Sequence, residues 1–108
     1  MNIKRIPEEY RVGGQRIEVR MVDRCDNNCI GMEFLASGYI EIADYYNKDR
    51  VQSEDSKVNT FYHELVHTIL GCMGKNELNE NEEFVNTFAG FLTEAMTTAV
   101  YQVEPENK

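Results

Sequence analysis

The strongest regular pattern in the sequence is an apolar stripe at helical spacing between about Ser56 and Met73. Apolar side chains recur there three and four residues apart, which places them on one face of an α-helix. Asp55 or Ser56 is expected to cap the start of this helix, and Gly71 and Gly74 are expected to end it. The pattern therefore predicts an amphipathic helix whose buried face consists of Val58, Phe61, Tyr62, Leu65, Val66, Ile69 and Leu70.

The same segment contains both histidines of the chain. His63 and His67 lie four residues apart with Glu64 between them, so that HELVH forms an H-E-x-x-H pattern. On a helix the two imidazoles lie one turn apart on one face, where they can bind one metal ion. Glu64 would then reach a water on that ion and act as its general base. The alternative is a chance match, in which both histidines and Glu64 are simply solvated.

A third ligand is needed, because a catalytic zinc ion usually has three protein ligands and one open position. The expected ligand is a carboxylate from the next helix, near whose start lie Glu80, Glu82 and Glu83. Glu82 is preferred because helical spacing places it on the flank shared by Val85 and Asn86, beside the buried stripe. Glu83 is the less favoured alternative ligand and Glu80 a distant one. Asn86, one turn after Glu82, is expected to hold a ligand in its orientation.

The second helix is expected from about Asn81 to Val100, with Asn79 or Asn81 as its N-cap. Gly90 in its middle is expected to allow close packing against the first helix. A short polar connection, Asn76–Asn81, would join the two helices. The apolar stripe of the second helix contains Phe84, Val85, Phe88, Leu92, Ala95, Met96 and Ala99.

Four strands are expected before the helices, because apolar and polar side chains alternate there. Gly13-Gly14 lies between the first two and indicates a hairpin. The polar segment Asp44–Ser53 is expected to be irregular, with a short helical turn at about Tyr45–Arg50. A small antiparallel sheet followed by two packed helices is an α+β fold. The expected strands are Glu8–Val12, Gln15–Val22, about Cys29–Ala36 and Tyr39–Ala43.

Length and charge limit the classes of protein to consider. The 108 residues predict one domain, 1–108, with a frayed tail from about 102 to 108. A formal net charge of −8 without a Lys/Arg cluster argues against binding to nucleic acid or to an anionic membrane. The chain has no apolar run of transmembrane length and no visible signal peptide, so the cytoplasm is the expected compartment.

The chain has three cysteines, Cys25, Cys29 and Cys72. An odd number without a secretion signal does not indicate a disulfide framework. Cys25 and Cys29 form a C-x-x-x-C pattern in a polar loop. They are expected to be unpaired thiols, with a metal or redox role as the alternative. Cys72 has apolar neighbours and is expected to be a small buried side chain.

HELVH, followed by EEFVNTFAGFL at Glu82–Leu92, resembles the gluzincin branch of zinc metallopeptidases. The similarity is greatest to the ImmA/IrrE-type family and to short phage-encoded metallopeptidases, and it covers about a third of the chain. In that family an E-x-x-A-N-x-F-A pattern on the second helix supplies the third zinc ligand. The resemblance implies a minimal zincin-like domain, one zinc ion per chain and Glu82 as that ligand, with Val85 in the alanine position and matches at Asn86, Phe88 and Ala89.

The resemblance implies hydrolysis of a peptide or protein substrate by a zinc-activated water, with Glu64 as general base. Zincins bind an extended substrate along an exposed strand, for which Tyr39–Ala43 is the expected edge. The alternative is an inactive or vestigial zincin that contains zinc and binds a protein partner. The sequence names neither a substrate nor an oligomeric state. A tyrosine is expected to stabilise the oxyanion, from among Tyr39, Tyr45, Tyr46 and Tyr62, of which Tyr62 fits the core better.

Overall fold

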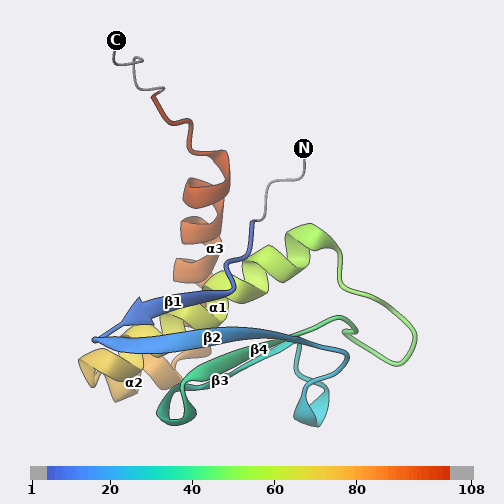
Figure 1. The fold of residues 1–108 in the computed structure, drawn as a ribbon, viewed down its shortest axis with the longest axis horizontal. Helices are drawn as coiled ribbons and strands as arrows, with labels where there is room; N and C mark the ends of the chain where they lie inside the picture. The colour runs from blue at the N-terminus through green and yellow to red at the C-terminus, as the bar shows by residue number, and fades with distance from the viewer. Residues whose placement is uncertain (1–4, 103–108) are drawn as a thin grey trace.

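The computed structural model describes residues 5–102, so most of the expected tail lies outside the described residues. Strands come first along the chain and helices follow (Figure 1), which confirms the α+β prediction. Short 3₁₀ turns at Asp26–Asn28 and Leu35–Ser37 lie on either side of the third strand. The elements are β1 (Glu9–Val12), β2 (Gln15–Val22), β3 (Gly31–Phe34), β4 (Tyr39–Ala43), α1 (Glu54–Met73), α2 (Asn76–Glu80) and α3 (Glu82–Thr98).

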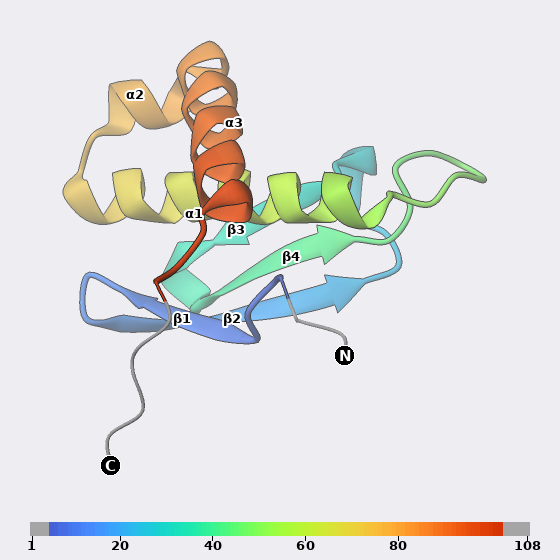
Figure 2. The ribbon, with the colours of Figure 1, turned by 90° about the horizontal axis from the view of Figure 1, so that it is seen from above.

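The four strands form one mixed sheet in the order β1-β2-β4-β3. The β1–β2 hairpin turns at Gly13 and Gly14, whose φ angles of 59° and 78° favour glycine. Both this pair and β3–β4 are antiparallel, whereas β2 and β4 are parallel. The chain leaves β2, forms β3 at the edge and returns as β4 between them. The expectation that Tyr39–Ala43 is an edge strand is therefore wrong, and β3 is the edge that lies nearest to the helices (Figure 2).

The core lies between the sheet and α1. Ile17, Ile40 and Ile42 from the sheet are fully buried and pack with Phe61 of α1. Tyr62 is partly buried against this cluster, as expected from its place on the apolar stripe. These contacts fix the face of α1 that the sheet covers. A second cluster joins α1 to the start of α3 and consists of Val66, Leu70, Val85 and Ala89.

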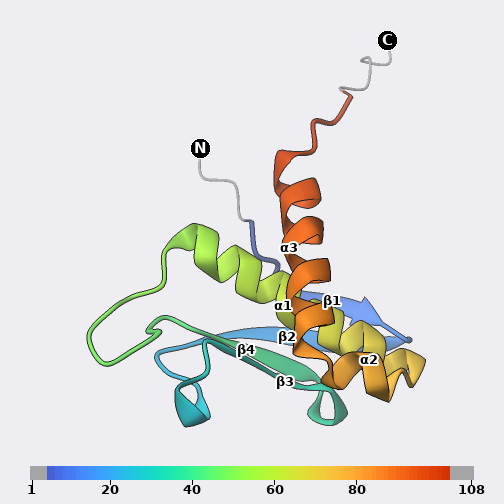
Figure 3. The same ribbon diagram turned by 180° about the vertical axis from the view of Figure 1, so that it is seen from behind.

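Only part of the apolar stripe on α3 is covered. Phe88 is 50% exposed and Met96 45%, and Phe91, beside the stripe, is 69% exposed. The reason is that α3 projects away from the rest of the molecule instead of running along α1 (Figures 1 and 3). Apart from the nearby backbone of α3 itself, no described atom lies within 4 Å of a Cβ built on Gly90, so its expected close packing is wrong, and Ala89 makes the contact instead. Among residues 5–102, no helix has the length and hydrophobicity needed to cross a membrane.

The helix termini differ in part from expectation. Ser53 caps α1 by accepting a hydrogen bond from the Ser56 amide at 3.1 Å, because the helix begins before the predicted caps Asp55 and Ser56. Asn81 caps α3 as expected, accepting from the Phe84 amide at 3.0 Å. The predicted polar connection between the long helices instead contains the short helix α2. The α1 helix continues through Gly71, and Gly74 ends it in the left-handed conformation.

Two smaller predictions are also wrong. Cys72 is exposed and not buried, because it lies near the end of α1, beyond the apolar stripe. Segment 45–50 forms bends closed by a bridge between Tyr45 and Val51 and not a helical turn. Cys25, Cys29 and Cys72 all have free thiols, which agrees with their expected unpaired state.

Candidate metal centre

Three side chains with metal-binding atoms meet where the first turn of α3 approaches α1. Nε2 of His63 lies 3.5 Å from Oε2 of Glu82, and Nε2 of His67 lies 3.4 Å from Oε1 of the same carboxylate. One ligand atom from each residue falls within 4.8 Å of the other two. Glu83 is exposed and does not take part, so the structure brings the preferred glutamate, and not its neighbour, to the histidines.

Local structure explains this convergence. The four-residue spacing on α1 places the imidazole rings of His63 and His67 one above the other, with their centroids 4.9 Å apart. Val85, one turn after Glu82, is fully buried against α1 and fixes the rotation of α3 about its axis. The Asn81 cap fixes the residue at which α3 begins. Glu82 therefore has its direction set by packing on one side and by a cap on the other.

Asn79 on α2 orients the second histidine. Its Oδ1 lies 2.6 Å from Nδ1 of His67, a distance at which an Nδ1–H donates to the amide oxygen. That tautomer leaves Nε2 unprotonated and free to bind a metal on the side of Glu82. Sequence reasoning assigned an orienting role to Asn86 instead. Asn86 lines the same pocket but makes no hydrogen bond to His63, His67 or Glu82 in the described part of the chain.

The sequence pattern does not predict the contact made by Asn79, because it does not predict α2. In a polar connection, an asparagine close to the start of a helix is most simply interpreted as its N-cap. The available signal was weak: two asparagines stand two residues apart, at 79 and 81, and only one of them can cap the helix. Asn81 is the cap, and α2 turns Asn79 toward His67.

Burial favours the neutral form of His63. The pKa of His63 is lowered first by desolvation and then by His67, while Glu82 acts in the opposite direction. A neutral imidazole is the form that binds metal ions. The electrostatics of the site therefore favour the protonation state that a metal ligand requires.

Glu64 lies on α1 and lines the same pocket, and its Oε2 would lie 3.0 Å from a Cβ built on Gly31 of β3. It is only 5% exposed, and its carboxylate makes no hydrogen bond to any residue in the range 5–102. Burial, with smaller contributions from the carboxylates of Glu33 and Glu82, raises the pKa of Glu64 to about 8. A buried carboxyl group that can accept and release a proton near neutral pH is suited to acid–base chemistry.

The pocket around these residues has a volume of about 780 Å³. One wall is the edge strand β3 with Cys29 and Ile30 before it, and another is α1 from Asn59 to His67. The third wall is formed by α2 and the first turns of α3, where Asn79, Glu80 and Glu82 lie. Glu80, although disfavoured as a ligand, thus belongs to the pocket.

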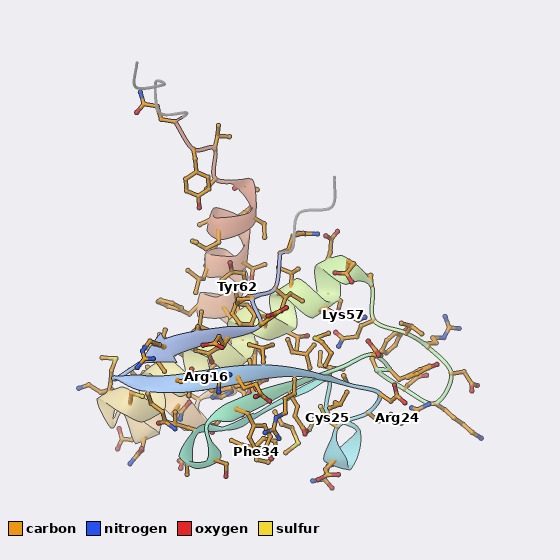
Figure 4. The ribbon with its side chains drawn as sticks, viewed as in Figure 1. Arg16, Arg24, Cys25, Phe34, Lys57 and Tyr62 are labelled. Carbon is orange, nitrogen blue, oxygen red and sulfur yellow. The ribbon has the colours of Figure 1, made fainter. Side chains whose placement is uncertain are left out.

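None of the four tyrosines considered for oxyanion stabilisation lines this pocket. Tyr39 stacks on Phe34 with ring centroids 4.7 Å apart, and Arg20 covers its ring. Tyr62 packs on the core, and Figure 4 labels Phe34 and Tyr62 on opposite sides of the sheet. Tyr45 and Tyr46 lie in the irregular segment between β4 and α1, so the structure does not bring the expected tyrosine to the site.

Gly31 allows β3 to approach α1 closely at the pocket. A Cβ at this position would lie 2.5 Å from Cγ2 of Thr60 and 3.0 Å from Oε2 of Glu64. We expect Gly31→Ala to lower the free energy of unfolding by about 1–3 kcal/mol through overpacking. Gly90→Ala is the control: its Cβ would meet open space, and it is expected to stabilise α3 by roughly 0.5–1 kcal/mol. Urea unfolding measures both, and equal stability of the two variants would contradict the close approach.

No protein-family model, curated protein or solved structure matches this chain in the comparisons. The resemblance to the gluzincins therefore stays a prediction made from the sequence. Any assignment of function depends on the geometry and chemistry of the pocket itself.

Proposed function

We propose that this chain is a zinc-dependent peptidase in which His63, His67 and Glu82 bind one zinc ion and Glu64 is the general base. The observation that carries the proposal is the spacing of the three ligand side chains. Zinc–ligand bonds of 2.0–2.1 Å in a tetrahedral site place neighbouring ligand atoms about 3.3–3.4 Å apart. The separations of 3.4 and 3.5 Å between the histidine nitrogens and the Glu82 oxygens are close to that value, and one ligand atom from each of the three residues lies within 4.8 Å of the other two.

The same separations argue against direct hydrogen bonds as the purpose of the cluster. Nitrogen–oxygen hydrogen bonds usually measure 2.7–3.2 Å, and those to charged groups are shorter still. Hydrogen bonding would also require protonated Nε2 atoms, whereas the contact with Asn79 favours an unprotonated Nε2 on His67. A donor set of two imidazoles and a carboxylate is typical of catalytic zinc sites.

The buried Glu64 has the features of a general base for hydrolysis. A bound zinc ion would supply Lewis-acid activation of a water and of the substrate carbonyl. Glu64 would accept the proton of the attacking water and later donate it to the amine that leaves. Its place in a largely desolvated wall of the pocket, with no competing hydrogen bond among residues 5–102, keeps the carboxylate available for that proton.

The substrate proposed for this site is an extended peptide or a protein segment that pairs with β3. Only one side of β3 is paired, to β4, and the other is the edge of the described sheet. Residues 30–33 of this edge line the pocket beside Glu64. A peptide added along β3 would therefore bring a backbone carbonyl close to the proposed catalytic groups by β-augmentation.

The alternative is a zinc-containing module that binds a protein partner without cleaving it. The exposed aromatic side chains of Phe88 and Phe91 favour this alternative, because apolar residues gathered on a projecting helix are typical of protein-binding surfaces. The cytoplasm is the proposed compartment in either case. Its support is the three free thiols of Cys25, Cys29 and Cys72, since small secreted domains usually pair their cysteines.

The test is hydrolysis of a mixed peptide library by purified protein loaded with one equivalent of zinc, followed by mass spectrometry. We expect new peptide ends that disappear after chelation and return when zinc is added back. A protein that binds one zinc ion and cleaves neither the library nor unfolded proteins would favour the binding module. A protein that binds no zinc would contradict both.

Asn79 provides a prediction about affinity that does not depend on catalysis. Removing a group that orients a metal-bound histidine typically weakens metal binding by about 10–100-fold, and Asn79→Ala is expected to do so here. Asn76→Ala is the matched control, because Asn76 lies on the same short helix outside the pocket. Competition with a zinc-binding dye measures both. Identical affinities of the two variants would exclude an orienting role for Asn79.

A further inference from the structure

The projecting helix α3 has a line of apolar side chains on a side that α1 leaves largely uncovered. Val85 and Ala89, which pack on α1, lie about 100° around the helix from this line. The members of the line follow one another at intervals of four, three and four residues, which is the spacing of a coiled-coil seam. This line, termed the outer strip, consists of Phe84, Phe88, Phe91 and Ala95.

Most of the outer strip is exposed. Phe88 is 50% exposed and Phe91 69%, and the ring centroids of Phe84 and Phe88 lie 5.7 Å apart, so the apolar surface is continuous. A phenylalanine buries about 150–250 Å² when it is covered, so Phe88 and Phe91 together leave about 200–300 Å² of aromatic surface open. A continuous apolar patch of this size on a small protein is typical of an interaction site.

The residues beside the outer strip are uncharged. Glu94 is the only charged residue in the sequence from Phe84 to Val100, and it is not part of the strip. In coiled coils, charged side chains beside the seam select the partner helix and its orientation. The neutral borders of this strip provide no selection for an oppositely charged partner, and two identical strips would bring no like charges together. The strip is therefore suited to a second strip of the same kind.

The spacing of the outer strip is symmetric in a way that fits an antiparallel pair. Intervals of four, three and four residues read the same from either end, so a two-fold axis at the middle of the strip would bring it opposite its own copy. Phe88 would then face Phe91 of the second copy, and Phe84 would face Ala95. The aromatic rings would meet at the centre, where the residues that contribute most to an interface usually lie.

The shape and charge of the molecule also favour the antiparallel arrangement. With 17 residues α3 is about 25 Å long, and it projects from the rest of the chain at its N-terminal end (Figures 1 and 3). A parallel pair would place the bodies of two chains, each of formal net charge −8, side by side. An antiparallel pair places them at opposite ends of the helices, farther apart than the screening length of about 8 Å at physiological salt.

We infer that two copies of this chain form a symmetric dimer through their outer strips, with the two α3 helices antiparallel. Covering Phe88 and Phe91 in both copies buries about 400–600 Å², and their neighbours raise the total to roughly 1,000 Å², near the lower limit for a specific interface. The dimer is therefore expected to dissociate in roughly the micromolar range. The strip residues do not line the pocket, so the inference does not depend on the proposed function.

Sedimentation velocity over a series of protein concentrations, without added metal, tests the dimer. The mass of the wild-type protein should rise from that of one chain to that of two. Phe88→Glu and Phe91→Lys should each weaken association by about 100-fold or more, because a symmetric dimer would bury each unpaired charge twice. Both side chains are exposed in the single chain, so the fold should be retained, which circular dichroism checks. Thr97→Lys is the control, since it adds a charge to an exposed position on the opposite side of α3 and should leave dimerisation unchanged.

Mixing the Phe88→Glu and Phe91→Lys proteins tests the antiparallel register. In that register the introduced glutamate faces the introduced lysine, and the remaining phenylalanines face each other, so a dimer of one chain of each should form. In a parallel pair each introduced charge would face a phenylalanine, and mixing would restore nothing. A wild-type protein that stays monomeric, equal weakening by Thr97→Lys, or a mixture that stays monomeric would overturn the inference.

Discussion

Zinc is expected to stabilise the wild-type protein and the Glu83→Gln variant against heat, but not the Glu82→Gln variant. A ligand that binds only the folded state at 100 times its dissociation constant adds about 2.7 kcal/mol. For a domain of this size each kcal/mol raises the melting temperature by roughly 4–8 °C, so the expected increase is roughly 10–20 °C. Glu82→Gln leaves two histidines and a neutral amide, and most of this increase should be lost.

Glu83→Gln is the matched control for Glu82→Gln. Glu82 and Glu83 both lie in the first turn of α3, so each substitution removes a similar interaction with the helix dipole. Both are exposed, and each variant changes the net charge by the same amount. The two side chains point in different directions, because only that of Glu82 lies next to His63 and His67. Thermal unfolding followed by circular dichroism, with and without zinc, measures the shifts. Equal shifts in the two variants would show that Glu82 is not a ligand.

The elements best predicted from the sequence are those whose signal is local. Strands Gln15–Val22 and Tyr39–Ala43 have the bounds expected from alternation, and the two long helices begin and end within two residues of expectation. Strand order has no such local signal, because alternation indicates which face of a strand is buried but not which strand lies beside it. The sequence therefore could not show that β4 is central and that β3 forms the edge.

In the candidate site, too, the residues placed by local spacing are predicted and those placed by contacts between distant elements are not. His63 and His67 are placed by helical spacing alone, and the direction of Glu82 follows from its offset to the buried Val85. Asn79 and Glu33 depend on contacts between elements distant in the chain, a short helix beside α1 and an edge strand beside Glu64. The exposure of Phe88 is a third case. Helical spacing predicts an apolar stripe on α3, but the angle between α3 and α1 determines how much of that stripe is buried.

Glu64→Gln is expected to reduce any peptidase activity by about 100- to 10,000-fold, the contribution usual for a positioned general base. The substitution preserves shape but removes the group that accepts the proton. Because Glu64 makes no hydrogen bond to other described residues and is not among the three clustered ligand side chains, zinc affinity should change little. The loss should therefore appear in kcat and not in metal content.

Glu80→Gln is the matched control for Glu64→Gln, since it neutralises another carboxylate of the same pocket that has no part in the proposed proton transfer. Initial rates on the best peptide of the library, at one equivalent of zinc, compare the two variants with the wild-type protein. A similar loss in both variants would show that the charge of the pocket matters and not a specific base. Retention of activity by zinc-loaded Glu64→Gln would remove Glu64 from the mechanism. Because Glu64 is the one carboxylate of the pocket that is nearly fully buried, only its replacement should separate metal binding from catalysis.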